Sequence, residues 1–279
     1  MITLKGAAVS AKIKEEIALI VKDLPGKTPK LAIVRVGNRP DDVSYERSAL
    51  KKMENFGLRA ESVCFPEDIS HEAFKEEFLK INQDPDVDGI LLLRPLPEQI
   101  READIAGIMD PEKDLDGISP ENIARVFSGD PNGFAPCTAE AVIQILKGYD
   151  ITIHGKLVTV VGRSMVVGRP LSMLLLKENA TVTICHTRTE NLMEVCRKAE
   201  ILVVAAGQKK MIDASYVGLD AVVIDVGIHV DENGKLCGDV DCESLEGKAS
   251  MATPVPGGVG TVTTAVLAKH LVMAAERNR

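Results

Sequence analysis

No apolar stretch in this sequence approaches the ~20 residues that a membrane-spanning helix requires. The first 24 residues carry charges throughout and lack the uninterrupted apolar core of a signal peptide. Positive charge is also in deficit, with 33 Lys and Arg against 41 Asp and Glu, a formal charge of −8. Nucleic-acid binding depends on neutralising phosphates with basic side chains, so this balance argues against it. An anionic ligand must instead be met by local basic groups or by helix N-termini.

Signatures of metal sites and disulfide frameworks are missing as well. The six cysteines include no C-x-x-C pair, and none of the five histidines lies at ligand spacing from a cysteine. We therefore expect no metal, and we interpret the cysteines as the reduced thiols of a cytoplasmic protein. Nor does the chain contain a tandem repeat or a low-complexity tract.

Short apolar runs alternate with segments of helical periodicity along the whole chain. With 45% hydrophobic and 27% charged residues over 279 positions, the composition is that of a globular protein with one large or two ordinary domains. The alternation predicts parallel sheets covered by helices on both faces. Expected strands lie in 30–37, 58–65, 87–97, 156–162, 181–186, 201–207 and 221–228, and expected helices in 9–24, 41–56, 70–83, 98–109, 138–149, 170–180 and 261–279. We place a domain boundary near 138–149, which gives domains 1–137 and 138–267.

The stretch "KLVTVVGRSMVVGRPLSMLLLKENATVTICH" is typical of a dinucleotide-binding βαβ unit. Gly162 allows a sharp turn off the strand, and Gly168 is expected to leave room for a pyrophosphate near the backbone. Pro170 suits the first helical turn, whose free N–H groups favour phosphate. The spacing is G-x5-G rather than G-x-G-x-x-G, so an ordinary βα turn remains an alternative.

The end of the second strand bears on cofactor choice. An NAD site usually places Asp or Glu there, whereas this chain has "CHTRT" with Thr187 and Arg188. Arg163 in the first loop is a second cation within reach of a ribose 2′-phosphate. The two arginines favour NADP. The alternative is that both are solvated surface residues.

Seven motifs together resemble the methylenetetrahydrofolate dehydrogenase/cyclohydrolase family. They are "VGNRPDDVSYERSALKKMENFGL", "PEKDLDG", "PCT", "VGRSMVVGRP", "TVTICHTRT", "DVGI" and "PVPGGVG", which occur in the family's order and cover nearly the whole chain. The resemblance implies a three-layer α/β folate-side domain, a Rossmann-type NAD(P)-binding domain and an active-site cleft between them. It also implies that helix 268–279 returns to the first domain, and that the protein is a homodimer through the Rossmann-type domain.

The same resemblance implies roles for individual residues. Tyr45 matches a tyrosine whose ring packs on the folate, and Asp116 matches the acid that binds the pterin. The substrate-side loop is matched by Pro256, Gly257, Gly258, Val259 and Gly260, and the nucleotide positions by Gly162, Arg163, Ser164, Thr187 and Ile228. On residue type alone there is an alternative interpretation, in which Tyr45 is an aromatic residue of the core and Asp116 is a turn residue.

Two positions depart from the family pattern. The family's active-site lysine falls four residues after the tyrosine, where this chain has Ala49, and its glutamine position is Leu93. The two departures fit together physically, because a buried glutamine without its lysine partner would cost ~1–3 kcal/mol in unmet hydrogen bonding, and leucine removes that cost. Thr261, after "PGGVG", and "PCTAEA" are smaller departures.

Neither neighbouring cation replaces that lysine well. Lys52 returns to the face of Tyr45 but lies ~4.5 Å further along the helix axis than Ala49. Arg94 is expected to point to the side opposite Leu93 if the strand is regular, and its pKa is too high for a general base.

The resemblance, together with its departures at Ala49 and Leu93, implies an NADP-dependent oxidation of 5,10-methylenetetrahydrofolate with weak or absent cyclohydrolase activity. Hydride transfer needs two carbons in near-attack contact, whereas hydrolysis of the methenyl product needs proton handling. The alternative is the ordinary bifunctional enzyme that produces 10-formyltetrahydrofolate. A third hypothesis, a non-catalytic folate- and NADP-binding protein, leaves the intact nucleotide loop unexplained.

Overall fold

The computed structural model describes residues 1–278, which divide into two compact units. The three-stranded unit comprises residues 13–137 and the chain from residue 264 onward. The six-stranded unit comprises residues 1–12 and 138–263. The predicted two-domain α/β fold is confirmed. Helices α1 (Gly6–Asp23) and α9 (Val259–Arg277) each contribute residues to both units.

The three-stranded unit is built on a parallel sheet in the order β3-β2-β4. Its strands are β2 (Lys30–Val36), β3 (Arg59–Phe65) and β4 (Gly89–Leu92). Along β2, Ala32 and Val34 join a buried cluster with Phe74 and Phe78, while the alternate residues of the strand are buried too. Both faces of this sheet are therefore covered.

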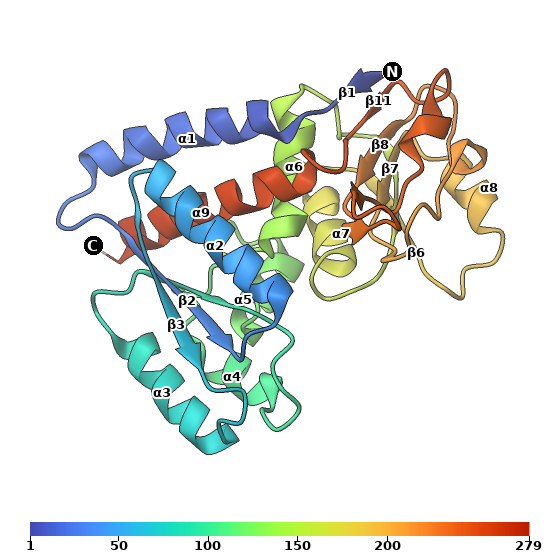
Figure 1. Ribbon diagram of the computed structural model, residues 1–279. Coiled ribbons are helices and arrows are strands. Elements are labelled where there is room, and N and C mark those ends of the chain that lie inside the picture. The colour runs from blue at the N-terminus through green and yellow to red at the C-terminus, as the bar shows by residue number, and fades with distance from the viewer. Residues whose placement is uncertain (279) are drawn as a thin grey trace. The chain divides into compact units, whose positions relative to one another are not determined.

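Helices of the three-stranded unit follow the strands that they cover. Helix α2 (Pro40–Asn55) and helix α3 (His71–Gln83) lie on opposite sides of the sheet in Figure 1. Shorter helices α4 (Glu102–Ile108) and α5 (Pro120–Ser128) follow β4. The helix expected over 98–109 begins only at Glu102, because residues 97–100 form a turn in which Ile100 N–H donates to Pro97 O.

The six-stranded unit has the strand order β1-β11-β8-β7-β5-β6, with every neighbouring pair parallel. Its longer strands are β5 (Leu157–Val161), β6 (Thr181–Cys185), β7 (Ile201–Val204) and β8 (Val222–Asp225). Helices α6 (Cys137–Gly148), α7 (Gly168–Lys177) and α8 (Leu192–Arg197) accompany them. Strand order on either side of β5 is that of a dinucleotide-binding sheet.

Residues 1–12, which we expected in the first domain, group with the six-stranded unit. Strand β1 (Ile2–Thr3) pairs in parallel with β11 (Met251–Ala252), and Gly6 N–H donates to Gly257 O at 2.8 Å. These bonds join the start of the chain to the six-stranded sheet. A short antiparallel hairpin, β9 (His229–Val230) with β10 (Leu236–Cys237), belongs to the same unit. The 3-10 turns η1 (Ala214–Tyr216) and η2 (Cys242–Leu245) complete it.

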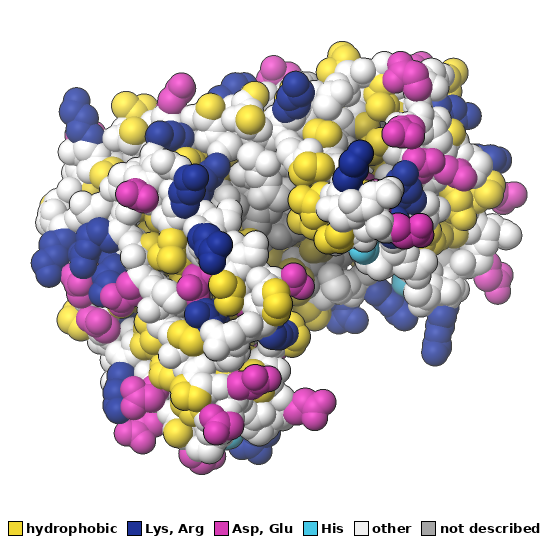
Figure 2. Space-filling model, viewed as in Figure 1, with side chains coloured by type: hydrophobic (Ala, Val, Ile, Leu, Met, Phe, Trp, Pro, Cys, Tyr) yellow, Lys and Arg dark blue, Asp and Glu magenta, His cyan; other side chains and the backbone are white. Residues whose placement is uncertain are grey.

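Acidic and basic side chains are interspersed over the face in Figure 2. Among residues 1–278, no helix is long and apolar enough to cross a bilayer. The described residues also include no cluster of three His, Cys, Asp or Glu side chains arranged to hold a metal ion.

Candidate active site

A cavity of about 510 Å³ lies at the carboxyl ends of strands β5, β7 and β6 in the six-stranded unit. It is lined by Gly162, Arg163 and Ser164 after β5, by His186, Thr187 and Thr189 after β6, and by Ala205, Ala206 and Gln208 after β7. Ligands of open parallel sheets bind at this edge. Four residues expected at the nucleotide, Gly162, Arg163, Ser164 and Thr187, thus border one cavity.

Backbone geometry shapes the first loop of this cavity. Gly162 has φ +128°, and a Cβ there would collide with Ala205 O. Gly168 is buried beside the same loop, and a Cβ on it would collide with Gly162 O. Gly168 therefore permits close packing of α7 on the loop. It does not line the cavity.

The loop after β6 projects polar side chains outward. His186 N–H donates to Thr189 Oγ1 at 2.8 Å, and Arg188 N–H donates to His186 Nδ1 at 3.1 Å. This tight turn leaves Thr187 and Arg188 exposed. Arg188 is not among the residues that line the cavity.

Arg163 at the cavity wall is exposed, and neither it nor Arg188 forms an ion pair with a carboxylate of residues 1–278. A cation without a carboxylate partner is available to an anionic ligand. The cavity therefore offers a positive charge close to the end of β6, where a dinucleotide places its adenosine ribose.

Ile228 and the 256–260 loop lie together in the same unit, outside the lining of the cavity. Ile228 is 62% exposed, and its Cδ1 lies 3.4 Å from the position of a Cβ on Gly260. Gly257 has φ +98°, so this loop depends on glycine for its path. Residues expected at the nucleotide and at the substrate are thus neighbours here.

In the three-stranded unit, Asp116 is held against the start of α6. Its Oδ1 accepts the Cys137 N–H at 2.8 Å. Burial raises the pKa of Asp116, while the Cys137 N–H and the nearby Arg94 guanidinium act in the opposite direction. Asp116 therefore holds a proton to higher pH than an ordinary aspartate.

Tyr45 on α2 lies within electrostatic reach of Asp116 and Cys137. Burial raises the pKa of its phenol, and the charges of Cys137 and Asp116 raise it further. The hydroxyl therefore stays protonated throughout the physiological range and can donate a hydrogen bond. The fold thus brings two predicted folate-side residues, 71 positions apart in sequence, within electrostatic reach of each other.

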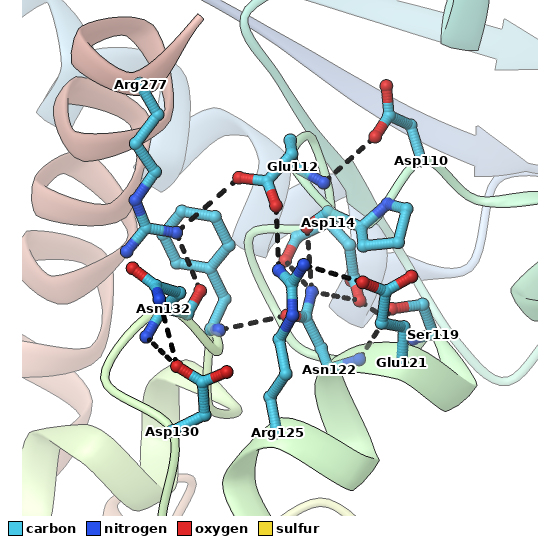
Figure 3. Close-up of polar contacts among 12 residues, drawn as sticks. Asp110, Glu112, Asp114, Ser119, Glu121, Asn122, Arg125, Asp130, Asn132 and Arg277 are labelled. Atoms are coloured by element: carbon cyan, nitrogen blue, oxygen red, sulfur yellow. Dashed lines mark hydrogen bonds and ion pairs between the residues drawn. The ribbon is translucent and has the colours of Figure 1, made fainter.

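The loop that carries Asp116 is fixed by buried polar contacts (Figure 3). Asp114 accepts hydrogen bonds from the backbone N–H groups of Ile118 at 3.0 Å and Ser119 at 2.8 Å. It also accepts one from the side-chain Nδ2 of Asn122 at 3.0 Å. Arg125 pairs with Glu112 at 2.7 Å. A satisfied network of this kind holds the neighbouring Asp116 in one position.

Ala49 and Leu93 are both buried, at 0% and 8% exposure. On α2, Ala49 shares its buried face with Glu46 and Met53. Lys52 points away from this position, because its Nζ lies 5.2 Å from the ring of Phe56, one turn towards the C-terminal end of the helix. Burial and the charge of Lys14 lower the pKa of Lys52.

Arg94 follows the end of a strand, where it pairs with a carboxylate. Strand β4 ends at Leu92, so the alternation expected of a regular strand does not reach Arg94. Its guanidinium pairs with Glu102 at 2.8 Å and lowers the pKa of Asp116, which places it on the Asp116 side.

Fold and cavity define a two-domain α/β protein with a dinucleotide-binding unit. Residues 136–279 match the NAD(P)-binding domain of tetrahydrofolate dehydrogenase/cyclohydrolase, and residues 4–116 match its catalytic domain. The chain belongs to the tetrahydrofolate dehydrogenase/cyclohydrolase family. This confirms the resemblance found in the sequence.

Several relatives align with nearly the whole length of this chain. A bifunctional protein FolD from Clostridioides difficile (strain 630) is 53% identical over 97% of this chain and 95% of its own length. The crystal structure of bifunctional FolD from Campylobacter jejuni is 37% identical, covers 100% of both chains and has a TM-score of 0.97. A Trypanosoma brucei FolD, described in complex with NADP and an inhibitor, is 34% identical over 98% of this chain and 95% of its own, with a TM-score of 0.89.

Proposed function

We propose that this chain oxidises 5,10-methylenetetrahydrofolate to 5,10-methenyltetrahydrofolate with NADP+, and that it hydrolyses the methenyl product weakly or not at all. The observation that carries the dehydrogenase is the cavity bordered by Gly162, Arg163 and Thr187 at the carboxyl ends of β5 and β6. The NADP complex of the T. brucei relative supports the choice of cofactor.

Each group has a part in the proposed hydride transfer. Gly162, Arg163 and Thr187 would hold NADP+, which would supply the hydride acceptor. The chain would hold the two reacting carbons in contact and exclude water. Tyr45 and Asp116 bind the folate, with Asp116 at its polar edge and the Tyr45 ring against its plane. Loop 256–260 is a further proposed folate-binding segment. None of these steps requires a lysine to transfer a proton.

Hydrolysis of the methenyl group places a different demand on the protein. Water must be activated and a proton moved, which is the work of an acid–base group. Ala49 provides no such group, Lys52 is directed to Phe56, and Arg94 is paired with Glu102. These placements support a loss of hydrolysis.

A second candidate is the bifunctional enzyme, with Asp116 or an ordered water relay in place of the lysine. The name carried by relatives of about 50% identity favours it. The raised pKa of Asp116 makes this carboxyl the best remaining proton donor.

One assay separates the candidates. The protein is supplied with methylenetetrahydrofolate and NADP+, and NADPH and the methenyl chromophore are followed separately. Methenyl accumulating in step with NADPH supports our proposal. Formation of NADPH with no methenyl chromophore beyond that of an enzyme-free control supports the bifunctional enzyme. The absence of both signals would contradict both candidates.

The cause is tested by restoring the missing pair. We expect Ala49→Lys with Leu93→Gln to raise the rate of methenyl hydrolysis at least tenfold, and Ala49→Lys alone to raise it less, because a buried lysine then lacks its partner. Ser48→Lys, on the exposed face of the same helix, is the matched control. No gain in the double variant would contradict the explanation.

The proposal includes a cytoplasmic location and a homodimer formed through the six-stranded unit. Light scattering of the purified protein checks the dimer, and a monomeric mass over the working concentration range would contradict it.

A further inference from the structure

Two buried carboxylates, Asp225 and Asp239, lie beneath the wall of the nucleotide cavity. Their exposed fractions are 1% and 0%. Asp225 ends β8, and Asp239 follows β10 in a "GDVD" stretch that is not among the motifs of the family resemblance. Burying a carboxylate is costly unless its oxygens are hydrogen-bonded, so the partners of these two groups define what they hold in place.

Asp225 holds the segment that carries Asp239. Its Oδ1 accepts the N–H groups of Gly227 at 2.9 Å and Asp239 at 3.0 Å, and its Oδ2 accepts the Val240 N–H at 3.0 Å. A Cβ on Gly238 would collide with Asp225 Oδ2. The backbone of this segment therefore lies directly on the carboxylate, with no side chain between them.

Asp239 in turn holds the cavity wall. Its Oδ2 accepts the N–H groups of Ala206 at 2.7 Å and Gly207 at 3.0 Å. Ala206 follows β7 and lines the cavity. The other oxygen, Oδ1, lies 2.7 Å from His229 Nε2 on the β9–β10 hairpin. A continuous chain of contacts thus runs from the end of β8 through Asp239 to Ala206.

We propose that Asp239, oriented by Asp225 and His229, is a positioning residue that fixes the Ala206–Gly207 wall and so sets the affinity for the dinucleotide. The inference rests on the proposed binding of NADP in this cavity. Two adjacent amides, those of Ala206 and Gly207, donate charge-assisted hydrogen bonds to this one carboxylate oxygen, which holds the loop in place. Without them the wall would lose its fixed position, and the cavity would have to be reordered at the moment of binding.

The test is titration of NADP+ into the unliganded protein and its variants. We expect Asp239→Ala to raise the Kd for NADP+ at least tenfold. Asp239→Asn keeps one oxygen for both amides and turns its amide group to His229, so we expect a Kd within threefold of the unaltered protein. Recovery by the asparagine variant is a result that general loss of stability would not produce.

Leu245→Ala is the matched control, because Leu245 is fully buried in the core of the same unit and does not line the cavity. It should lower the melting temperature while leaving the Kd within twofold. If Asp239→Ala binds NADP+ as tightly as the unaltered protein, or loses no more affinity than Leu245→Ala, the inference is overturned.

His229→Ala decides the question if Asp239→Ala does not fold. The His229 side chain is 24% exposed, so its removal is tolerated more easily. We expect a two- to fivefold rise in Kd, and no change would overturn the inference. Failure of the unaltered protein to bind NADP+ would instead overturn the proposed function, and the inference with it.

Discussion

Ala49 has no exposed surface, which decides what its replacement by lysine would cost. An ammonium group at a buried position is stable only with a hydrogen-bonding partner, and otherwise its pKa falls until it is neutral. Leu93 is also buried and offers no polar atom. A polar side chain introduced at either buried position alone would therefore need a partner that the residue at the other position does not supply.

Arg163 allows a direct test of cofactor choice. We expect Arg163→Ala to raise the Kd for NADP+ at least tenfold and that for NAD+ less than threefold, because only NADP+ carries the 2′-phosphate. Arg169→Ala, which removes an exposed cation on the adjoining helix, is the control. Equal losses for the two nucleotides, measured by titration, would contradict the assignment.

Single residues also mark where sequence patterns stop being informative. The positions of Gly162 and Thr187 follow from the βαβ pattern alone. Arg94 does not, because β4 ends two residues before it and alternation no longer fixes its direction. Asp239 lacks any local signal for its role at the cavity, since the amides of Ala206 and Gly207 that it accepts are 33 and 32 positions away.

Among elements, the buried strands were the most predictable. Strands β2, β5, β7 and β8 are composed mostly of apolar residues, which favours burial on both faces. Two-residue strands such as β1 and β11 carry no periodicity and exist only through their pairing. Helices α5 and α8 are short enough that neither was predicted, although Ser119 and Pro120 are a start signal for α5.

The end of β8 gives a prediction for pH. Burial raises the pKa of Asp225 from 3.8 to about 6, so between these values the folded protein binds more protons than the unfolded chain. Its contribution to the free energy of unfolding is present below about pH 4 and is lost as pH rises to about 6, by about 2–3 kcal/mol.

Comparison with Asp225→Asn isolates this contribution from other groups. Denaturant unfolding at pH 4, 5, 6 and 7 should show the unaltered protein losing stability relative to the variant up to about pH 6, with a constant difference above it. A difference independent of pH would contradict the shifted titration.

For the whole molecule, the two units provide separate readouts of the two ligands. We expect saturating NADP+ to slow amide hydrogen exchange at least tenfold in residues 162–169 and 205–208, because the bound nucleotide suppresses local opening of these loops. Exchange at the ends of β2 and β3 should change less than twofold. NAD+ at the same concentration is the control, and equal protection of both sheets would contradict the assignment of the nucleotide to the six-stranded unit.

The parallel pairing of β1 with β11 has a consequence for biosynthesis. At ~5–20 residues per second, Ile2 leaves the ribosome some tens of seconds before its neighbour Met251 has been polymerised. Until then β1 lacks the strand through which it joins the six-stranded sheet, and residues 13–137 are translated within the same interval. The nascent chain must therefore keep its opening segment unpaired until translation is nearly finished.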